Sequence, residues 1–244
     1  MDLWEYTYLA DTDSYALNDF EVINDSSIEN KGYLGVIDSN GKIEGCVPMY
    51  IKTENDENFK PVTDMNNTFR ECTELVIPPI IPKTVTTMFT TFNSCKHLEY
   101  PPILPPSLYN MYGTFYNCKS LQYAPNIPDT VTNLAQCFVF CSKIEYSPTI
   151  PNGVTTLRGT FGWCTSLKTA PTIPSSVVDM KNTFVGCYNL EGSLIINTTP
   201  TLYESCLSEA ATKSSGLIIS GNCSILQEIL NTKSSLSKIS IKND

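Results

Sequence analysis

The sequence predicts a solenoid, a fold in which coils of similar sequence stack along one axis. The first observation is a column of six cysteines that stand 23 residues apart, at positions 72, 95, 118, 141, 164 and 187. The second is that other columns keep the same period, with a Phe three residues before each of these cysteines and a Leu or Ile three residues after. A single unit of this length cannot bury its own apolar edge, so neighbouring units must stack to form a core.

Within each unit the sequence predicts one short helical turn and one or two short strands. The Met, Phe and Cys of a unit follow the spacing i, i+4, i+7, which is a helical stripe. The next segment, such as LQYAPNIP at 121–128, contains proline and is too short for a helix, which indicates an extended run closed by a turn. A threonine precedes most of the Phe residues, and we expect its hydroxyl to bond backbone groups at the bend (Thr68, Thr91, Thr114, Thr160 and Thr183).

The two ends of the chain depart from the period and are interpreted as caps, which a solenoid needs to cover its terminal coils. We expect an N-terminal cap at 1–42, the solenoid at 43–199 with its regular coils at 65–197, and a C-terminal cap at 200–244. The sequence Ser39-Asn40-Gly41 predicts a hairpin turn between two β-rich runs, and a degenerate coil is expected to begin near Ile43.

The C-terminal cap is expected to alternate helices and strands. Residues 201–215 and 222–236 have helical patterns, whereas 216–220 and 237–241 have the composition of strands. Leu217 and Ile239 stand 22 residues apart, which indicates that coils continue here with longer helices.

The repeating unit, M-x-x-T-F-x-x-C-x-x-L-x-x-x-P-x-I-P-x-x-V-T-x, resembles the bacterial surface leucine-rich repeats of the BspA type. Their 23-residue coils carry the signature F-x-x-C-x-x-L…I-P-x-x-V, and the resemblance covers residues 62–197. It implies a leucine-rich-repeat solenoid of short strands and short helical turns with caps at both ends. Two features depart from the family: Thr replaces the small Ala before Phe, and the strand segment carries an extra proline, as at Pro125 and Pro148.

The resemblance also implies a function, because family members are adhesion or protein-binding modules on bacterial surfaces, and related repeats occur in phage proteins. No catalytic residues come with the family. The first hypothesis is therefore a non-enzymatic, adhesin-like module for protein–protein or protein–glycan interaction. The alternative is a structural or receptor-binding component of a bacteriophage virion.

Composition excludes some partners. The net charge is −9 without any cluster of Lys and Arg, which argues against a nucleic-acid partner.

No apolar run approaches the ~20 residues that a membrane-spanning helix needs. The N-terminus lacks the basic and apolar regions of a secretory signal. We expect a cytoplasmic or virion-associated protein, or a cell-surface or secreted one if an export signal was removed. The sequence gives no indication of oligomeric state.

The cysteine column has several possible meanings: disulfides, metal ligands, a nucleophile or buried free thiols. Matching rotamers on adjacent rungs do not present the ~90° twist of a disulfide. No C-x-x-C pair occurs and His97 is the only histidine, which argues against a zinc site and a partnered nucleophile. We predict a ladder of free, buried thiols that pack as small apolar residues, and we expect no cofactor, metal or catalytic site.

Candidate ligand-binding residues follow the inward Leu column by one and two positions. Tyr100, Tyr123 and Tyr146 share one column in three consecutive coils, beside Glu99 and Glu145. Tyrosine offers a large contact area with a polar tip, so the strand face carrying these residues is a candidate surface for a protein or glycan ligand. The other interpretation is that stacked tyrosines only shield the strand edges. Trp163 is expected to be exposed and is a further candidate contact.

Overall fold

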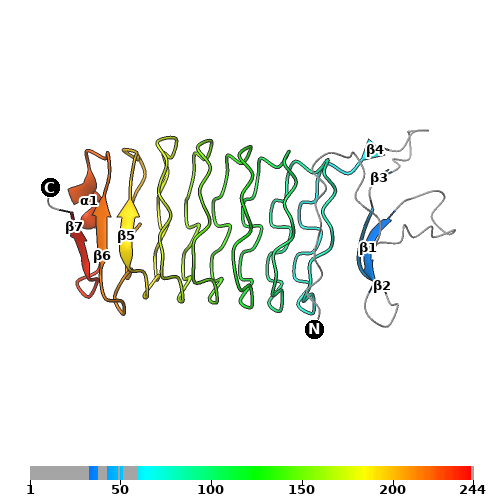
Figure 1. The fold of residues 1–244 in the computed structure, drawn as a ribbon, viewed down its shortest axis with the longest axis horizontal. Coiled ribbons are helices and arrows are strands. Elements are labelled where there is room, and N and C mark those ends of the chain that lie inside the picture. The colour runs from blue at the N-terminus through cyan, green and yellow to red at the C-terminus, as the bar shows by residue number, and fades with distance from the viewer. Residues whose placement is uncertain (1–32, 38–42, 49, 52–59, 243–244) are drawn as a thin grey trace.

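The computed structural model describes residues 33–37, 43–48, 50–51 and 60–242. Between 62 and 242 the chain winds into coils that lie side by side along the long axis of the molecule (Figure 1). A column of parallel bridges joins the residues that precede each unit, from Asp64–Thr87 through to Asp179–Leu202. Each bridge spans one period, so the coils stack in register and the predicted solenoid is confirmed.

The segment predicted as a helical turn forms consecutive β-turns instead. In the first coil the N–H groups of Thr68 and Cys72 donate to the carbonyl oxygens of Met65 and Phe69, at 3.2 and 3.1 Å. The Phe69 N–H between them donates to Thr91 of the next coil, at 2.9 Å. Donors thus alternate between bonds within the coil and bonds to the next coil, which satisfies the backbone without a helix.

These turns require left-handed backbone at two positions of each coil. The third residue of the unit has positive φ, as at Asn67 (58°), and so does the residue before the cysteine, as at Glu71 (63°). The helical spacing in the sequence does not reveal this geometry, because a helical turn and a run of β-turns both direct the Met, Phe and Cys side chains toward the interior. The neighbouring coil supplies hydrogen-bond partners that an isolated helical turn would lack, and these bonds offset the cost of positive φ.

The interior consists of columns of like side chains. Phe92, Phe115, Phe138 and Phe161 are fully buried, and successive rings stack with centroids 5.7 to 5.8 Å apart. Burial of one such side chain stabilises the fold by roughly 1.5–3 kcal/mol. The Met or Leu, Leu or Ile, and Val columns fill the rest of the core.

Two polar columns connect each coil to the preceding one. The Thr91 hydroxyl donates to the Met65 carbonyl oxygen at 2.8 Å, and later coils repeat this bond. The Cys95 thiol donates to the Phe69 carbonyl oxygen at 3.0 Å, and the next four ladder thiols do the same. The prediction that threonine hydroxyls satisfy the backbone at the bend is confirmed.

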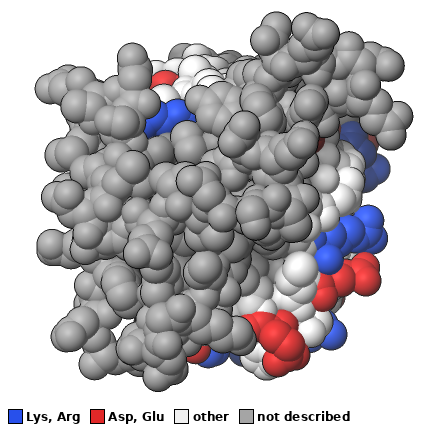
Figure 2. Space-filling view, turned by 90° about the vertical axis from the view of Figure 1, so that its right-hand side faces the viewer, with Lys and Arg blue, Asp and Glu red and all other residues white. Residues whose placement is uncertain are grey.

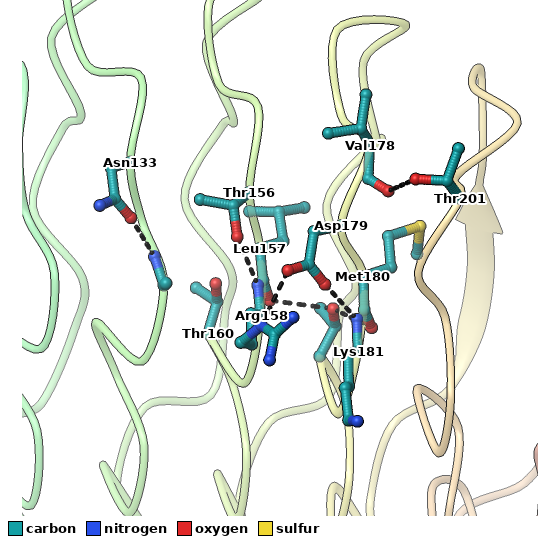
Figure 3. Close-up of polar contacts among 12 residues, drawn as sticks. Asn133, Thr156, Leu157, Arg158, Thr160, Val178, Asp179, Met180, Lys181 and Thr201 are labelled. Carbon is teal, nitrogen blue, oxygen red and sulfur yellow. Dashed lines mark hydrogen bonds and ion pairs between the residues drawn. The ribbon is translucent and has the colours of Figure 1, made fainter.

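A third polar column starts each coil (Figure 3). Asn133, Thr156 and Asp179 each accept a hydrogen bond from the backbone N–H two residues later, at 3.0, 3.3 and 3.0 Å. This bond mimics a backbone turn and fixes the entry into the run of β-turns. Asp179 also accepts from Nε of Arg158 in the preceding coil, at 2.8 Å, which adds an ion pair between coils.

The N-terminal part contains two antiparallel pairs. Strand β1 (Tyr33–Ile37) pairs with β2 (Ile43–Pro48), and β3 (Tyr50–Ile51) pairs with β4 (Lys60–Pro61). The first pair agrees with the predicted hairpin, although its turn at 39–41 lies outside the described residues. The antiparallel pairing of β2 differs from the parallel stacking expected of a degenerate coil near Ile43. The division at 42 and 199 stays a prediction.

The C-terminal part contains a three-stranded parallel sheet of β5 (Gly192–Ile195), β6 (Leu217–Ser220) and β7 (Ile239–Ile241). Leu217 pairs with Ile239, as their spacing predicts. The helix predicted at 222–236 is shorter, α1 at Leu226–Leu230. Within the described ranges, no helix is both long and apolar enough to cross a bilayer.

The helix predicted at 201–215 is wrong. This segment forms turns, with positive φ at Ser205, Glu209 and Ala211. The reason is that its carbonyl oxygens accept hydrogen bonds from the preceding coil. The Phe184 N–H, for example, donates to the Cys206 carbonyl oxygen at 2.9 Å. A helix would use those carbonyl groups internally and leave the preceding coil without acceptors.

Candidate functional site

The predicted tyrosine column lies on the surface of three consecutive coils. Tyr123 and Tyr146 are 51% and 63% exposed, and Tyr100 is half-buried. The Tyr100 and Tyr123 rings are 6.3 Å apart between centroids and tilted by 59°. Tyr146 forms a parallel bridge with Thr169 of the next coil, which fixes its backbone in the stack. The stripe therefore presents two accessible phenol rings on a rigid support.

The acidic residues beside the stripe each have a partner in the next coil. Glu145 accepts a hydrogen bond from Nζ of Lys168 at 2.7 Å, and this bond raises the pKa of the lysine. Glu99 lies 3.5 Å from the amide nitrogen of Gln122. Glu145 is thus neutralised locally, so the stripe is less acidic than the sequence suggests.

Trp163 lies outside the tyrosine column and is less exposed than the sequence predicts. The indole is half-buried, with its ring 6.3 Å from Phe140 and 6.0 Å from Tyr188 between centroids. A methyl group built on Gly186 of the next coil would lie 2.6 Å from the indole ring. Glycine in the next coil therefore leaves the space into which the indole packs. A prediction made from the column of Trp163 alone does not take this neighbour into account.

A groove next to Tyr146 was not found from the sequence. It has a volume of about 580 Å³ and runs across the prolines of two coils. Its polar lining comes from Ser147, Thr149, Asn152, Thr169, Thr172, Ser175 and Asn197. The available sequence signal is that polar residues replace Ile in one column, since Ile80 and Ile103 of earlier coils correspond to Thr149 and Thr172.

Several groove side chains have no hydrogen-bond partner among the residues that the structure describes. Thr149, Asn152, Thr172, Ser175 and Asn197 are exposed, and none of their side chains makes a hydrogen bond to another described residue. Hydroxyl groups elsewhere in the coils are engaged, as when Ser176 donates to the Val154 carbonyl oxygen at 2.6 Å. The groove therefore offers hydroxyl and amide groups to an external ligand.

The five buried thiols of the cysteine ladder do not provide a nucleophile at neutral pH. Five ladder thiols, from Cys95 to Cys187, are fully buried, as predicted, whereas Cys72 in the first coil is exposed. Burial raises the pKa of Cys95 to about 12 and that of Cys164 to about 12. These thiols stay protonated and donate to carbonyl oxygens, so they are hydrogen-bond donors as well as space-fillers.

One ring nitrogen of His97 is hydrogen-bonded, and the described part of the chain holds no cluster of metal-ligating side chains. Nδ1 of His97 lies 2.8 Å from the Thr73 carbonyl oxygen, which occupies that ring nitrogen. Among residues 33–37, 43–48, 50–51 and 60–242, no three His, Cys, Asp or Glu side chains gather so as to hold a metal ion.

The acidic balance of the chain belongs to its N-terminal part. Residues 1–59 contain 13 acidic and three basic side chains, whereas residues 60–244 contain 12 and 13. Figure 2 shows side chains of both signs next to one another where the described surface is visible. The solenoid itself is nearly neutral, and a ligand is not selected by a strong overall field.

Comparison with known proteins gives the fold. No protein-family model matches the sequence, and no curated protein matches it. A leucine-rich repeat protein from Bacteroides ovatus superposes with a TM-score of 0.51 and 21% identity over 79% of this chain and 58% of that one. The fold is a leucine-rich-repeat solenoid. The leucine-rich repeat protein of T. pallidum gives 0.50 and 19% identity over 72% of this chain and 81% of that one.

A third leucine-rich-repeat solenoid is described as a leucine rich cell surface protein of Faecalibacterium prausnitzii. Its TM-score is 0.54, with 21% identity over 83% of this chain and 55% of that one. The chain thus spans little more than half the length of two of these three proteins. The resemblance to leucine-rich repeats is confirmed at the level of the fold.

Proposed function

We propose that this leucine-rich-repeat solenoid is a non-enzymatic, adhesin-like interaction module that binds a protein or glycan ligand through its strand face at a cell surface. The observation that carries the proposal is the pair of exposed rings at Tyr123 and Tyr146, aligned in consecutive coils. The second hypothesis, a virion component, has no observation in its favour.

The physical support is pre-organisation. The stripe residues sit on a stack whose coils are joined by backbone bonds, such as the Gln122 N–H to the Glu99 carbonyl oxygen at 3.0 Å. A rigid support lowers the ordering cost of binding, and tyrosine loses little side-chain entropy on contact. Shielding of the strands does not account for Tyr146, because more than half of its side chain is exposed.

The test is replacement of Tyr100, Tyr123 and Tyr146 together by Ser, with Tyr109→Ser as the control. Tyr109 is 50% exposed but lies in another column of the coil. Binding to immobilised gelatin, serum albumin, laminarin, mannan and polygalacturonate is measured for each protein. We expect the triple variant to lose binding to the probes that the native chain retains, with an unchanged melting temperature. Equal binding by the triple variant, or no probe bound by the native chain, contradicts the proposal.

A further inference from the structure

Building on that function, we infer that the groove beside Tyr146 binds a stretch of uncharged polysaccharide. The groove and the stripe are continuous, since Ser147 follows Tyr146 in the chain and Thr169 pairs with Tyr146, and both line the groove. The inference narrows the ligand of the proposed site from a protein or a glycan to one chemical class.

The groove lining carries no charge. Every described residue that lines the groove is neutral at physiological pH: hydroxyl, amide, proline and small aliphatic side chains. Glu145 and Lys168, which belong to the same two coils, form an ion pair with each other at 2.7 Å. A carboxylated or phosphorylated ligand would enter without a cation to pair with, so the groove does not select anions.

The groove lining is rich in hydrogen-bonding groups. A sugar hydroxyl both donates and accepts, and so does each hydroxyl or amide side chain. Asn152 and Asn197 offer amides and Thr149, Thr172 and Ser175 offer hydroxyls, all exposed and without partners in the described chain. Such a set matches a chain of hexoses, whose hydroxyl groups recur at short intervals.

Part of the groove lining is apolar and rigid. Pro148, Pro171 and Pro174 line the groove, and the last two are buried. Proline has no backbone N–H and keeps a fixed φ, so polar recognition depends on the other side chains of the lining. A mixed lining of proline and polar side chains suits the C–H faces and hydroxyl edges of a pyranose ring.

An aromatic residue adjoins the groove without lining it, since Tyr146 precedes Ser147 and pairs with Thr169. Its side chain is 63% exposed and can offer a ring face to the C–H groups of a sugar and a phenol hydroxyl to a hydrogen bond. A site for a protein partner would instead be expected to contain Arg, Trp or a desolvated apolar pocket, because these contribute most of the binding free energy in protein interfaces. No Arg or Trp lines the groove.

The experiment measures binding of the full chain to three neutral polysaccharides, laminarin, mannan and glycogen, and to polygalacturonate and gelatin. Two double variants are compared, Asn152→Ala/Thr172→Val in the groove and Asn126→Ala/Ser193→Ala outside it. Asn126 corresponds to Thr149 one coil earlier, and both control residues are exposed and do not line the groove. Affinity electrophoresis gives the dissociation constants, and circular dichroism checks folding.

We expect at least one neutral polysaccharide to bind, and the groove variant to lose about tenfold in affinity from two missing hydrogen bonds. The control variant should bind as the native chain does. Equal loss in both variants, tighter binding of polygalacturonate, or no binding of any neutral polysaccharide overturns the inference. If gelatin binds, and is lost in the triple Tyr variant but not in the groove variant, the proposed function stands and the polysaccharide inference fails.

Discussion

The indole ring of Trp163 occupies the space that a side chain at Gly186 would need. A methyl group there would lie 2.6 Å from the ring, although the positive φ of this column is tolerated by Phe140 (61°) and by Trp163 itself (60°). Steric room for the indole, more than backbone freedom, therefore explains the glycine. The two residues act as one packing unit across adjacent coils.

Replacement of Gly186 by Ala should destabilise the fold by about 2–4 kcal/mol, which combines the left-handed backbone with overpacking against the indole. Gly192→Ala is the matched control, because Gly192 also has positive φ (79°) but no atom within 4 Å of an added methyl group. Its cost should be about 1–2 kcal/mol. Urea unfolding measures both, and equal losses would disprove the steric explanation.

The thiols should react in a fixed order in the native protein. Cys72 is exposed, whereas Cys95, Cys118 and Cys141 behind it are fully buried. We expect iodoacetamide at pH 8 to alkylate Cys72 within minutes and to leave the buried thiols unmodified until the chain unfolds. Peptide mass spectrometry assigns each site. Early alkylation of Cys141 in folded protein would show that the stack opens between coils.

Alkaline pH should lower the stability of the fold through the same thiols. The pKa of Cys164 is about 12 in the fold, against 9.0 for the ordinary thiol, because of burial. Between these values the unfolded chain has lost its thiol proton and the folded chain has not, so the free energy of unfolding falls as pH rises. Each such thiol contributes a slope of about 1.4 kcal/mol per pH unit.

The matched test is Cys164→Ala, compared with the native chain between pH 8 and 11 by urea unfolding. Above pH 9 the free energy of unfolding of the native chain should fall steeply with pH. The slope for the variant should be shallower by about 1.4 kcal/mol per pH unit, the contribution of one thiol. Below pH 9 the two slopes should agree. Identical slopes at high pH would mean that the buried thiols ionise without unfolding.

The solenoid could be predicted from the sequence because stacking places residues of one column in one environment, so the Phe and Cys columns kept their identity. The turn geometry could not, because a helix and a run of β-turns bury Met65, Phe69 and Cys72 alike. The segment at 201–215 was misassigned for a related reason: its pattern suits a helix, but the preceding coil requires its carbonyl groups.

The candidate site was predicted in part. The exposure of Tyr123 and Tyr146 could be predicted from their column in the repeat, because it depends only on their own coil and its immediate neighbours. Trp163 was misplaced because its burial depends on Gly186 in the next coil. The groove was missed because it is defined by side chains, such as Asn152 and Thr172, that have no hydrogen-bond partner among the described residues. Residue types alone do not show which side chains bond to a neighbouring coil.

The hydrogen bonds of the turn segment give the stack a direction. The backbone N–H of Phe92 reaches forward to Thr114 of the following coil, at 2.9 Å, while the Thr91 hydroxyl reaches back to Met65 of the preceding one. A cut on the C-terminal side of a coil would strand the N–H groups of its turn segment. A cut on the N-terminal side would strand hydroxyls and thiols together with N–H groups of the strand segment, such as that of Gln122, which donates to Glu99 of the preceding coil at 3.0 Å. Removal of coils from either end of this protein should therefore leave backbone N–H groups without acceptors, in the turn segment at one end and in the strand segment at the other.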